Sequence, residues 1–296
     1  MLTPSQLDSL QPLKTASAYK REYKMFLNWA IDNNYLICEE TLIYYTDYLQ
    51  NIQNMAPNTI RSKISMVKKE LLINGKRLES CDVLDLKIKR INTGYVPTKA
   101  EIFSQDQIEL FLREAPNEEY IMMKFILLVG FYCCARIDDL TYLKWSELSK
   151  TRSGIKIQIS GNKNYTNREN IAPNDVDDPF ILEYLYDRIY ELRKISRIKI
   201  DRAFLKYDNG KLTNNPIGRN TLSEVPMKIA EFLGLDNCHD YSGHSIRRTS
   251  ASVGAENGMS VSHLRELGGW KSENAALGYI QTSSNYKKKT RRYVVE

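Results

Sequence analysis

Apolar positions recur at helical spacing through the first third of the chain. Between residues 16 and 31 they are Tyr19, Tyr23, Phe26, Leu27 and Ala30, a spacing that places them on one face of a helix. The same pattern predicts helices over residues 40–52, from Pro57 to Asn74-Gly75, and over 83–91. The first part of the chain is therefore predicted to be a small helical bundle.

The periodic pattern is lost between residues 93 and 101, where Gly94 and Pro97 interrupt the chain. A new helix is predicted from Ser104, because Gln107 follows it at the spacing of a capping box. These signals predict a helical domain over residues 1–95 and a second domain over residues 96–296.

The second domain is predicted to be mostly helical with one small β-hairpin. An apolar run covers residues 120–135, and a short helix is expected over 138–143. Strict alternation over 155–159 predicts a strand, which a polar turn over 161–167 connects to a return strand over 168–172. Helices are expected to resume at about residue 179 and to dominate to the end of the chain. The predicted fold class is mainly α with a small β-hairpin or sheet.

Composition describes a soluble globular protein long enough for two domains. Of 296 residues, 42% are apolar and 26% are charged, and the formal net charge is +6. This charge is compatible with a polyanionic partner without specifying one. The five cysteines form no C-x-x-C pair, so neither a zinc site nor a disulfide framework is expected. The protein is therefore expected to work in a reducing compartment. No signal peptide or membrane-spanning segment is apparent, and no membrane partner is expected.

Basic residues concentrate in the second half of the first domain. Residues 55–90 hold nine basic and four acidic side chains. The third predicted helix is therefore the better candidate for contacting phosphates, and the alternative is an ordinary solvated helix face. Its basic residues are Arg61, Lys63, Lys68 and Lys69.

Candidate chemistry lies in the second domain. Arg136 follows the apolar run, and His244 and Arg247 are one helical turn apart. Trp270 follows two glycines, and Tyr279 comes nine residues later. Arginines, an imidazole and a phenol together suit a phosphate diester, because guanidinium groups neutralise phosphoryl oxygens and a phenol can attack phosphorus.

The order of these motifs resembles the tyrosine recombinase (phage integrase) family. The motifs are Arg136-Ile-Asp-Asp139-Leu140, His244-x-x-Arg247-Arg248-Thr249, Leu267-Gly268-Gly269-Trp270 and Tyr279. The resemblance covers the second domain, and the first domain matches the family's core-binding domain in size and placement. Asp139 stands where glutamate is commoner, and Trp270 where many members have histidine. The segment 268–280 is most similar to recombinases of eukaryotic mobile elements, the Crypton and DIRS kinds.

The resemblance implies a site-specific DNA recombinase that cuts and rejoins strands through a 3′-phosphotyrosine at Tyr279. Arg136 and Arg247 would bind the phosphate oxygens, supported by Asp139, and His244 would bind the phosphate and take the tyrosine proton. Trp270 would donate its indole N–H or position the tyrosine helix.

The family also uses a lysine on a β-hairpin turn. Lys163 is the first choice for it and Lys156 the second, and the alternative for Lys163 is an ordinary exposed turn lysine. The expected partners are double-stranded DNA and further copies of the chain, as a homodimer on one site and a homotetramer in the synaptic complex.

No cofactor is expected. A covalent intermediate conserves the energy of the broken bond, so rejoining needs no ATP, and the three histidines show no metal-ligand spacing. The nucleus is the expected location for a protein of a eukaryotic mobile element, and the cytoplasm or nucleoid otherwise.

Two alternatives remain open at this stage, a type IB-like topoisomerase and a DNA-binding protein derived from a recombinase that no longer cuts. A metal-dependent nuclease is disfavoured, because no cluster of carboxylates or histidines suits a metal. Tyr286 is a rival nucleophile in a polar run and is less favoured than Tyr279. The basic tail over residues 286–296 could dock on a neighbouring protomer, direct nuclear import or simply be solvated.

Overall fold

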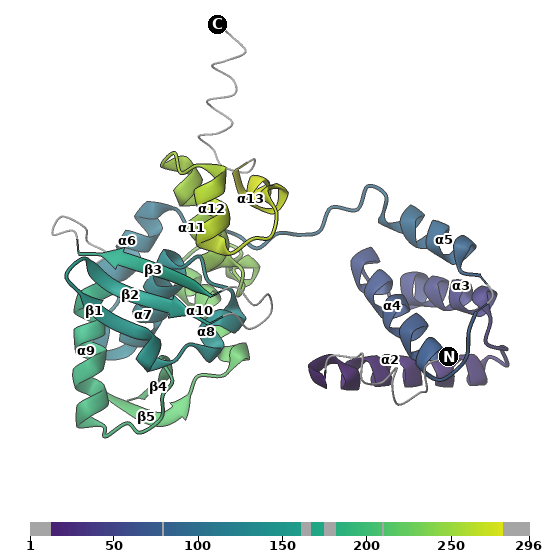
Figure 1. Cartoon of the computed structure of the whole chain (residues 1–296), viewed down its shortest axis with the longest axis horizontal. Coiled ribbons are helices and arrows are strands. Elements are labelled where there is room, and N and C mark those ends of the chain that lie inside the picture. Colours follow the sequence, from purple (N-terminus) through teal and green to yellow (C-terminus); the bar gives the residue numbers. More distant parts are fainter. Residues whose placement is uncertain (1–12, 79, 161–166, 175–181, 209, 281–296) are drawn as a thin grey trace, which may run out of the picture. The chain divides into compact units, whose positions relative to one another are not determined.

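The computed structural model describes residues 13–78, 80–160, 167–174, 182–208 and 210–280. The chain divides into two compact units, residues 1–98 and 99–296. Each unit (Figure 1) has a hydrophobic core of its own. No helix in the described ranges is long and apolar enough to cross a membrane.

The first unit is helical, as its periodicity predicts. Its core gathers one apolar face from each helix, including Phe26, Leu42, Ile60 and Leu84. Gly75, at a φ of 73°, follows the end of the third predicted helix. The elements are α2 (Leu13–Asp32), α3 (Glu39–Asp47), the π-helical turn η1 (Tyr48–Ile52), α4 (Pro57–Ile73) and α5 (Asp82–Asn92).

The second unit is mostly helical, and the predicted capping box at Ser104 is confirmed. Its helices are α6 (Gln105–Glu114), α7 (Asn117–Tyr132), α8 (Ile137–Tyr142), α9 (Leu182–Ile195), α10 (Arg219–Phe232), α11 (Ser245–Glu256), α12 (Val261–Gly268) and α13 (Glu273–Ile280). Two 3-10 turns are η2 (Trp145–Glu147) and η3 (Cys238–Asp240).

The strands form two small antiparallel sheets in the described part of the chain. In the first, β2 (Gly154–Ile159) pairs with β1 (Leu148–Thr151) and with β3 (Arg168–Pro173). The second is a hairpin of β4 (Leu205–Asp208) and β5 (Lys211–Pro216). The β2 and β3 strands were predicted, whereas the β4–β5 hairpin, in the part of the chain where helices were expected to dominate, was not. The segment Lys-Leu-Thr-Asn-Asn-Pro of β5 has too little apolar alternation to indicate a strand, and it becomes one by pairing with β4.

Helix α7 is the centre of the second unit. It packs against α9, α10, α11 and strands of both sheets, so it is apolar on nearly every face and gives the long apolar run of the sequence. The helix ends at Tyr132, and Cys134 reverses the chain with a φ of 45°. Arg136 follows at once as the N-cap residue of α8, so the end of a core helix positions this arginine.

Candidate active site

Arg247 is held inside the second unit by backbone carbonyls. It lies in the first turn of α11 and is 3% exposed. Its guanidinium donates to the carbonyl of Cys134 at 2.5 Å and to that of Gly268 at 2.8 Å. The ring of Trp270 lies 4.4 Å from its Cζ, in a cation–π contact. Trp270 is therefore in place to fix the orientation of this arginine.

Arg136 lies beside Arg247 and is more open. Its side chain is 27% exposed, and one of its terminal nitrogens donates to the carbonyl of Gly269 at 3.3 Å. Partial burial lowers the pKa of Arg136, and the positive charge of nearby Arg247 lowers it further. The group stays protonated at neutral pH, so the mutual repulsion indicates a site that favours an anion.

Asp139 contacts Arg136 mainly through the backbone of Arg136. Its Oδ2 accepts a hydrogen bond from the backbone N–H of Arg136 at 3.0 Å, while the guanidinium of Arg136 lies 4.0 Å away. The closest charged partner of this carboxylate is Arg168, at 2.6 Å. Asp139 thus fixes the backbone of Arg136 and leaves its guanidinium largely uncompensated.

Arg168 is the residue that sequence reasoning missed. It opens β3, and its side chain is 7% exposed. It donates to the carbonyls of Cys133 at 3.1 Å and Leu267 at 2.7 Å, besides its bond to Asp139. The surrounding Thr-Asn-Arg-Glu-Asn is a polar sequence typical of an exposed turn, and its one signal is that the arginine begins a predicted strand.

Three consecutive backbone carbonyls each accept a hydrogen bond from one of the three arginines. Leu267 accepts from Arg168, Gly268 from Arg247 and Gly269 from Arg136. Carbonyls satisfy guanidinium donors without adding a negative charge. Among the described residues bonded to this group, the three guanidinium charges meet one carboxylate, that of Asp139, which leaves an excess of two positive charges.

The two glycines of this segment are required by close packing. A Cβ on Gly268 would lie 2.3 Å from the ring of Trp270. Gly269 has a φ of 59°, and a Cβ there would lie 2.8 Å from Cδ of Arg168. The Gly-Gly-Trp motif therefore brings the backbone against both the indole and the buried arginine.

His244 lies at the edge of this group. It is the N-cap residue of α11 and is exposed. Its pKa is lowered by desolvation and then by the positive charge of Arg247, with smaller contributions from Arg219 and Arg136. The free protein therefore presents a neutral imidazole at pH 7, which can accept a proton.

The nucleophile and the hairpin lysine are only partly described. Tyr279 lies in the last turn of α13, and its side chain falls outside the described residues. Lys163 lies outside them too, between β2 and β3. The second choice, Lys156 on β2, forms an ion pair with Glu169 at 2.7 Å. Helix α13 packs on α11 and α12, with Ala276 buried against the small cluster to which Trp270 belongs.

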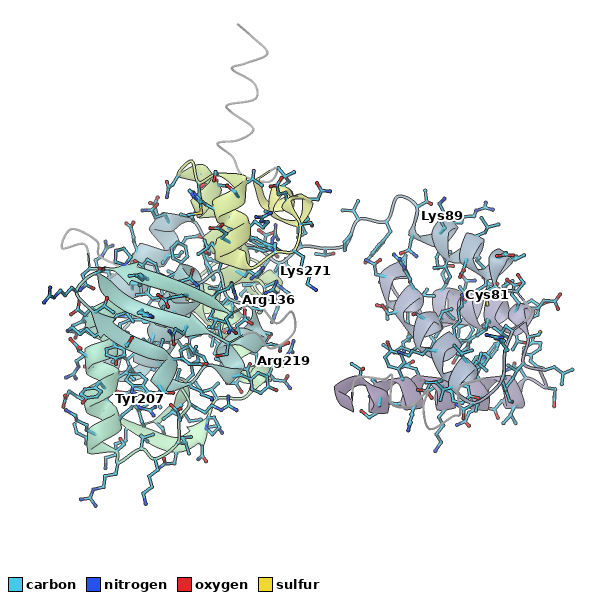
Figure 2. The ribbon with its side chains drawn as sticks, in the orientation of Figure 1. Cys81, Lys89, Arg136, Tyr207, Arg219 and Lys271 are labelled. Carbon is cyan, nitrogen blue, oxygen red and sulfur yellow. The ribbon has the colours of Figure 1, made fainter. Side chains whose placement is uncertain are left out.

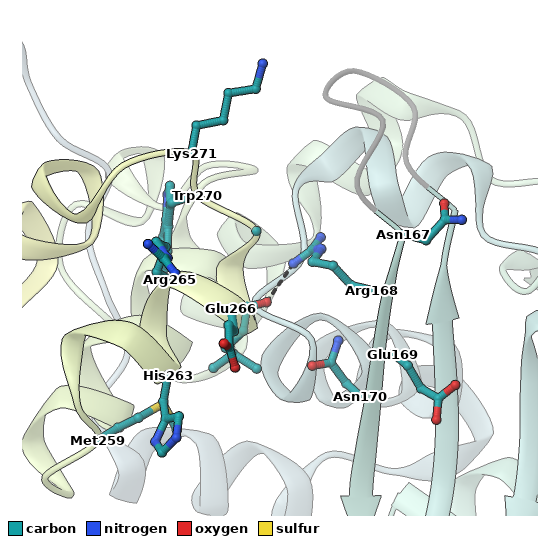
Figure 3. A pocket seen from close by; sticks show the side chains of 12 residues that line it. Asn167, Arg168, Glu169, Asn170, Met259, His263, Arg265, Glu266, Trp270 and Lys271 are labelled. Carbon is teal, nitrogen blue, oxygen red and sulfur yellow. Dashed lines mark hydrogen bonds between the residues drawn. The ribbon is translucent and has the colours of Figure 1, made fainter.

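An open cleft of about 580 Å³ lies beside Arg168 and the Gly269-Trp270 segment (Figure 3). Arg168 and Asn170 of β3 line one side, and Trp270 and His263 line the other. Figure 2 shows Arg136, Arg219 and Lys271 along one flank of the second unit. No group of three His, Cys, Asp or Glu side chains in the described ranges is placed to hold a metal ion.

The candidate DNA-binding residues of α4 differ in their surroundings. Arg61 is exposed. Lys63 forms an ion pair with the buried Glu22, and Lys68 binds Asp85 at 2.9 Å. Lys69 lies over the ring of Tyr19, 5.8 Å from its centroid. Arg61 is thus the member of this set that is most open to a partner.

Comparison with known proteins identifies the class of this protein. Residues 101–285 match the profile described as "Phage integrase family". The chain belongs to this family and is a DNA recombinase of the tyrosine recombinase type, as its motifs predict. A comparison with curated proteins gives no match.

Solved structures of tyrosine recombinases share the fold. XerH recombinase in a post-cleavage complex with its difH substrate has a TM-score of 0.67 and 15% identity, covering 88% of this chain and 73% of that one. The Tn1549 transposon integrase with circular intermediate DNA has a TM-score of 0.66 and 13% identity over 100% of both chains. A lambda integrase tetramer on a Holliday junction has a TM-score of 0.64 and 15% identity, covering 95% of this chain and 76% of that one. The predicted fold class is confirmed.

Proposed function

We propose that this protein is a site-specific recombinase that cuts and rejoins DNA strands through a covalent 3′-phosphotyrosine at Tyr279. The observation that carries the proposal is the set of Arg136, Arg168 and Arg247, held by consecutive carbonyls with an excess of positive charge. Preorganised donors of this kind stabilise charge that develops on phosphoryl oxygens in a transition state.

Each step of the proposed cleavage uses a residue of the second unit. The Tyr279 oxygen forms a bond to the scissile phosphorus while the bond from phosphorus to the 5′-oxygen breaks. The exposed edge of Arg136 and the guanidinium of Arg247 bind the non-bridging oxygens. The neutral imidazole of His244 accepts the tyrosine proton. Lys163 gives a proton to the leaving 5′-oxygen.

Rejoining reverses these steps. The phosphotyrosine retains the energy of the broken diester, so a free 5′-hydroxyl can displace the tyrosine without ATP. The charge stabilisation that a metal ion would otherwise supply falls to the arginines.

The proposed partners are double-stranded DNA and further copies of the chain. The fold is shared with recombinases solved on DNA as a dimer and as a tetramer, which supports a homodimer on one site and a homotetramer in the synaptic complex. The first unit would contact the DNA backbone, with Arg61 as the exposed candidate on α4. Function in the nucleus is proposed for the case of a eukaryotic mobile element.

The deciding experiment uses nicked suicide substrates drawn from the DNA that flanks the coding sequence. Once the strand is cut, the short fragment beside the nick diffuses away, and the protein stays covalently attached. We expect an adduct that resists denaturants in the wild type and in Tyr286→Phe, and its complete loss in Tyr279→Phe. An adduct of equal yield in Tyr279→Phe would refute the assignment of the nucleophile. The absence of any adduct across the flanking sequences would count against the proposed function.

A further inference from the structure

We infer that Arg168 is a positioning residue for the reaction, one that sets Arg136 and Arg247 without touching the DNA. The inference rests on the proposed function and extends it to a residue outside the recognised motifs. The side chain extends from β3 to the end of α12, where it donates a hydrogen bond to the carbonyl of Leu267 (Figure 3).

The terminal nitrogens of Arg168 are engaged by the protein. One binds the carbonyls of Cys133 and Leu267, and the other binds the carboxylate of Asp139. The group is nearly inaccessible to solvent. Because the carboxylate of Asp139 compensates its charge, Arg168 is less suited to binding a phosphate than Arg136 and Arg247, whose bonded acceptors are carbonyls.

The acceptors of Arg168 adjoin those of the other two arginines. Cys133 precedes Cys134, whose carbonyl binds Arg247. Leu267 precedes the two glycines, whose carbonyls bind Arg247 and Arg136. Consecutive peptide units are covalently linked through a Cα atom. A displacement of the Cys133 or Leu267 carbonyl therefore also moves the carbonyl of the next residue, Cys134 or Gly268. Arg168 thus fixes both backbone segments between which Arg247 is held.

Arg168 also determines which guanidinium the carboxylate of Asp139 pairs with. With Arg168 in place, the carboxylate lies 2.6 Å from that guanidinium and 4.0 Å from that of Arg136. Without it, the buried carboxylate would have Arg136 as its nearest cation, and pairing there would remove positive charge from the site. A lysine cannot replace this function, because one ammonium group lacks the planar fork that reaches three acceptors.

The position of Arg168 at the start of β3 gives the contact a second consequence. Strand β3 pairs with β2 along its length, and the segment between the strands carries Lys163. Arg168 therefore ties the base of the lysine-bearing hairpin to the backbone that holds the arginines.

Cleavage kinetics test the inference in Arg168→Met and Arg168→Lys, with the exposed Arg152→Met as the matched control. We expect adduct formation in a single turnover to fall about 10- to 100-fold in both Arg168 variants, with DNA affinity within about 3-fold of the wild type. The control should match the wild type. Arg168→Met should slow the Arg136→Ala protein by a smaller factor than it slows the wild type, because part of its effect acts through Arg136 and residues that act as a unit are not additive. Effects that multiply in the double variant would overturn the inference.

The charge contribution is separated by Arg168→Met/Asp139→Asn, which restores the excess of two positive charges. We expect this variant to stay slow, because the bonds to Cys133 and Leu267 are still missing. Recovery to the wild-type rate would show that charge balance alone matters and would overturn the positioning role.

A readout independent of cleavage separates this inference from the proposed function. In protein with ¹⁵N-labelled arginine, the guanidinium hydrogens of Arg247 should exchange slowly with solvent in the wild type and in Arg152→Met. They should exchange at least about 10-fold faster in Arg168→Met, because local opening exposes them. Equal exchange in all three proteins would overturn the inference, even if the wild type formed the expected adduct. A wild type without an adduct would refute the proposed function and leave the exchange result to decide this inference.

Discussion

Lysines of the first unit and two arginines of the candidate active site are compensated in different ways. On α4 and α5, Lys63, Lys68 and Lys87 each bind a carboxylate, those of Glu22, Asp85 and Asp47. In the second unit, Arg136 and Arg247 bind backbone carbonyls. Both kinds of contact satisfy the donors.

The difference decides which cations remain available to DNA. A carboxylate cancels the charge it binds, so a paired lysine has less to gain from a phosphate. A carbonyl satisfies the same donors and leaves the net charge in place. Burial then strengthens the attraction for an anion, because water screens it less. The arrangement indicates structural lysines in the first unit and an anion-binding site in the second, and the following experiments test this contrast.

The largest effect is expected from Arg247→Ala. It removes a preorganised donor, so the rate of adduct formation should fall on the order of 10²- to 10³-fold. Single-turnover cleavage of the nicked substrate measures this, with Arg152→Ala as the control and DNA affinity as a second readout. A rate within a few fold of the wild type would remove Arg247 from the catalytic group.

Next in size is the effect of Lys63→Met on stability. The variant leaves the buried carboxylate of Glu22, 6% exposed, with the exposed Arg21 at 3.7 Å as a weak partner. We expect a loss of about 3 kcal/mol in the free energy of unfolding of the first unit, measured by denaturant titration. Lys63→Met/Glu22→Leu should regain part of it. A variant of unchanged stability with weaker DNA binding would instead make Lys63 a phosphate contact.

A glycine pair sharpens the contrast in the second unit. Gly269→Ala and Gly258→Ala both place a side chain at positive φ, 59° and 86°, and each should lose about 1 kcal/mol of stability for that reason. A Cβ at Gly269 also meets Arg168, whereas one at Gly258 meets nothing within 4 Å. Only Gly269→Ala should slow cleavage. Equal cleavage rates in the two variants would show that the carbonyl at position 269 tolerates displacement.

A smaller effect is expected from Arg61→Ala. The exposed side chain should contribute one phosphate contact, so DNA affinity should fall a few fold and the slope of log K against log salt should decrease by about 1. Binding titrations at several salt concentrations measure the slope, and stability should be unchanged. An unaltered slope would exclude Arg61 from the interface.

The smallest effect concerns pH. The pKa of His244 is lowered from 6.5 by desolvation and by the neighbouring arginines, so its neutral form predominates at and above pH 6.5. Cleavage should be insensitive to His244 titration from pH 7 upward and should decline as pH falls below 6.5, while His244→Gln should lack this decline. The contribution of His244 to the free energy of unfolding should also decrease as pH falls below 6.5, because the unfolded chain binds the proton more readily than the folded one. A wild-type rate that rises on acidification would exclude His244 as the proton acceptor.

Local signals in the sequence were sufficient for most elements and for the order of the motifs. Helical spacing from Tyr19 to Ala30 and the capping box at Ser104 depend on residues within a few turns of each other, so they can be found in one sequence. The same holds for the strands β2 and β3. The motifs carrying Arg136, Arg247 and Trp270 lie far apart along the chain, and the resemblance to a family grouped them before the structure did.

Tertiary structure alone decided how each cation is compensated. Nothing near Arg168 in the sequence indicates that it is buried, because its acceptors lie 35 and 99 positions away. Lys63 looks like any surface lysine, and its partner Glu22 is 41 positions away. The hairpin β4–β5 likewise depends on strand pairing, which the short polar sequence of β5 does not predict. Helix periods and caps arise between neighbours in the chain, whereas burial of a charge depends on which distant groups the fold brings against it, and that difference sets what this sequence reveals by itself.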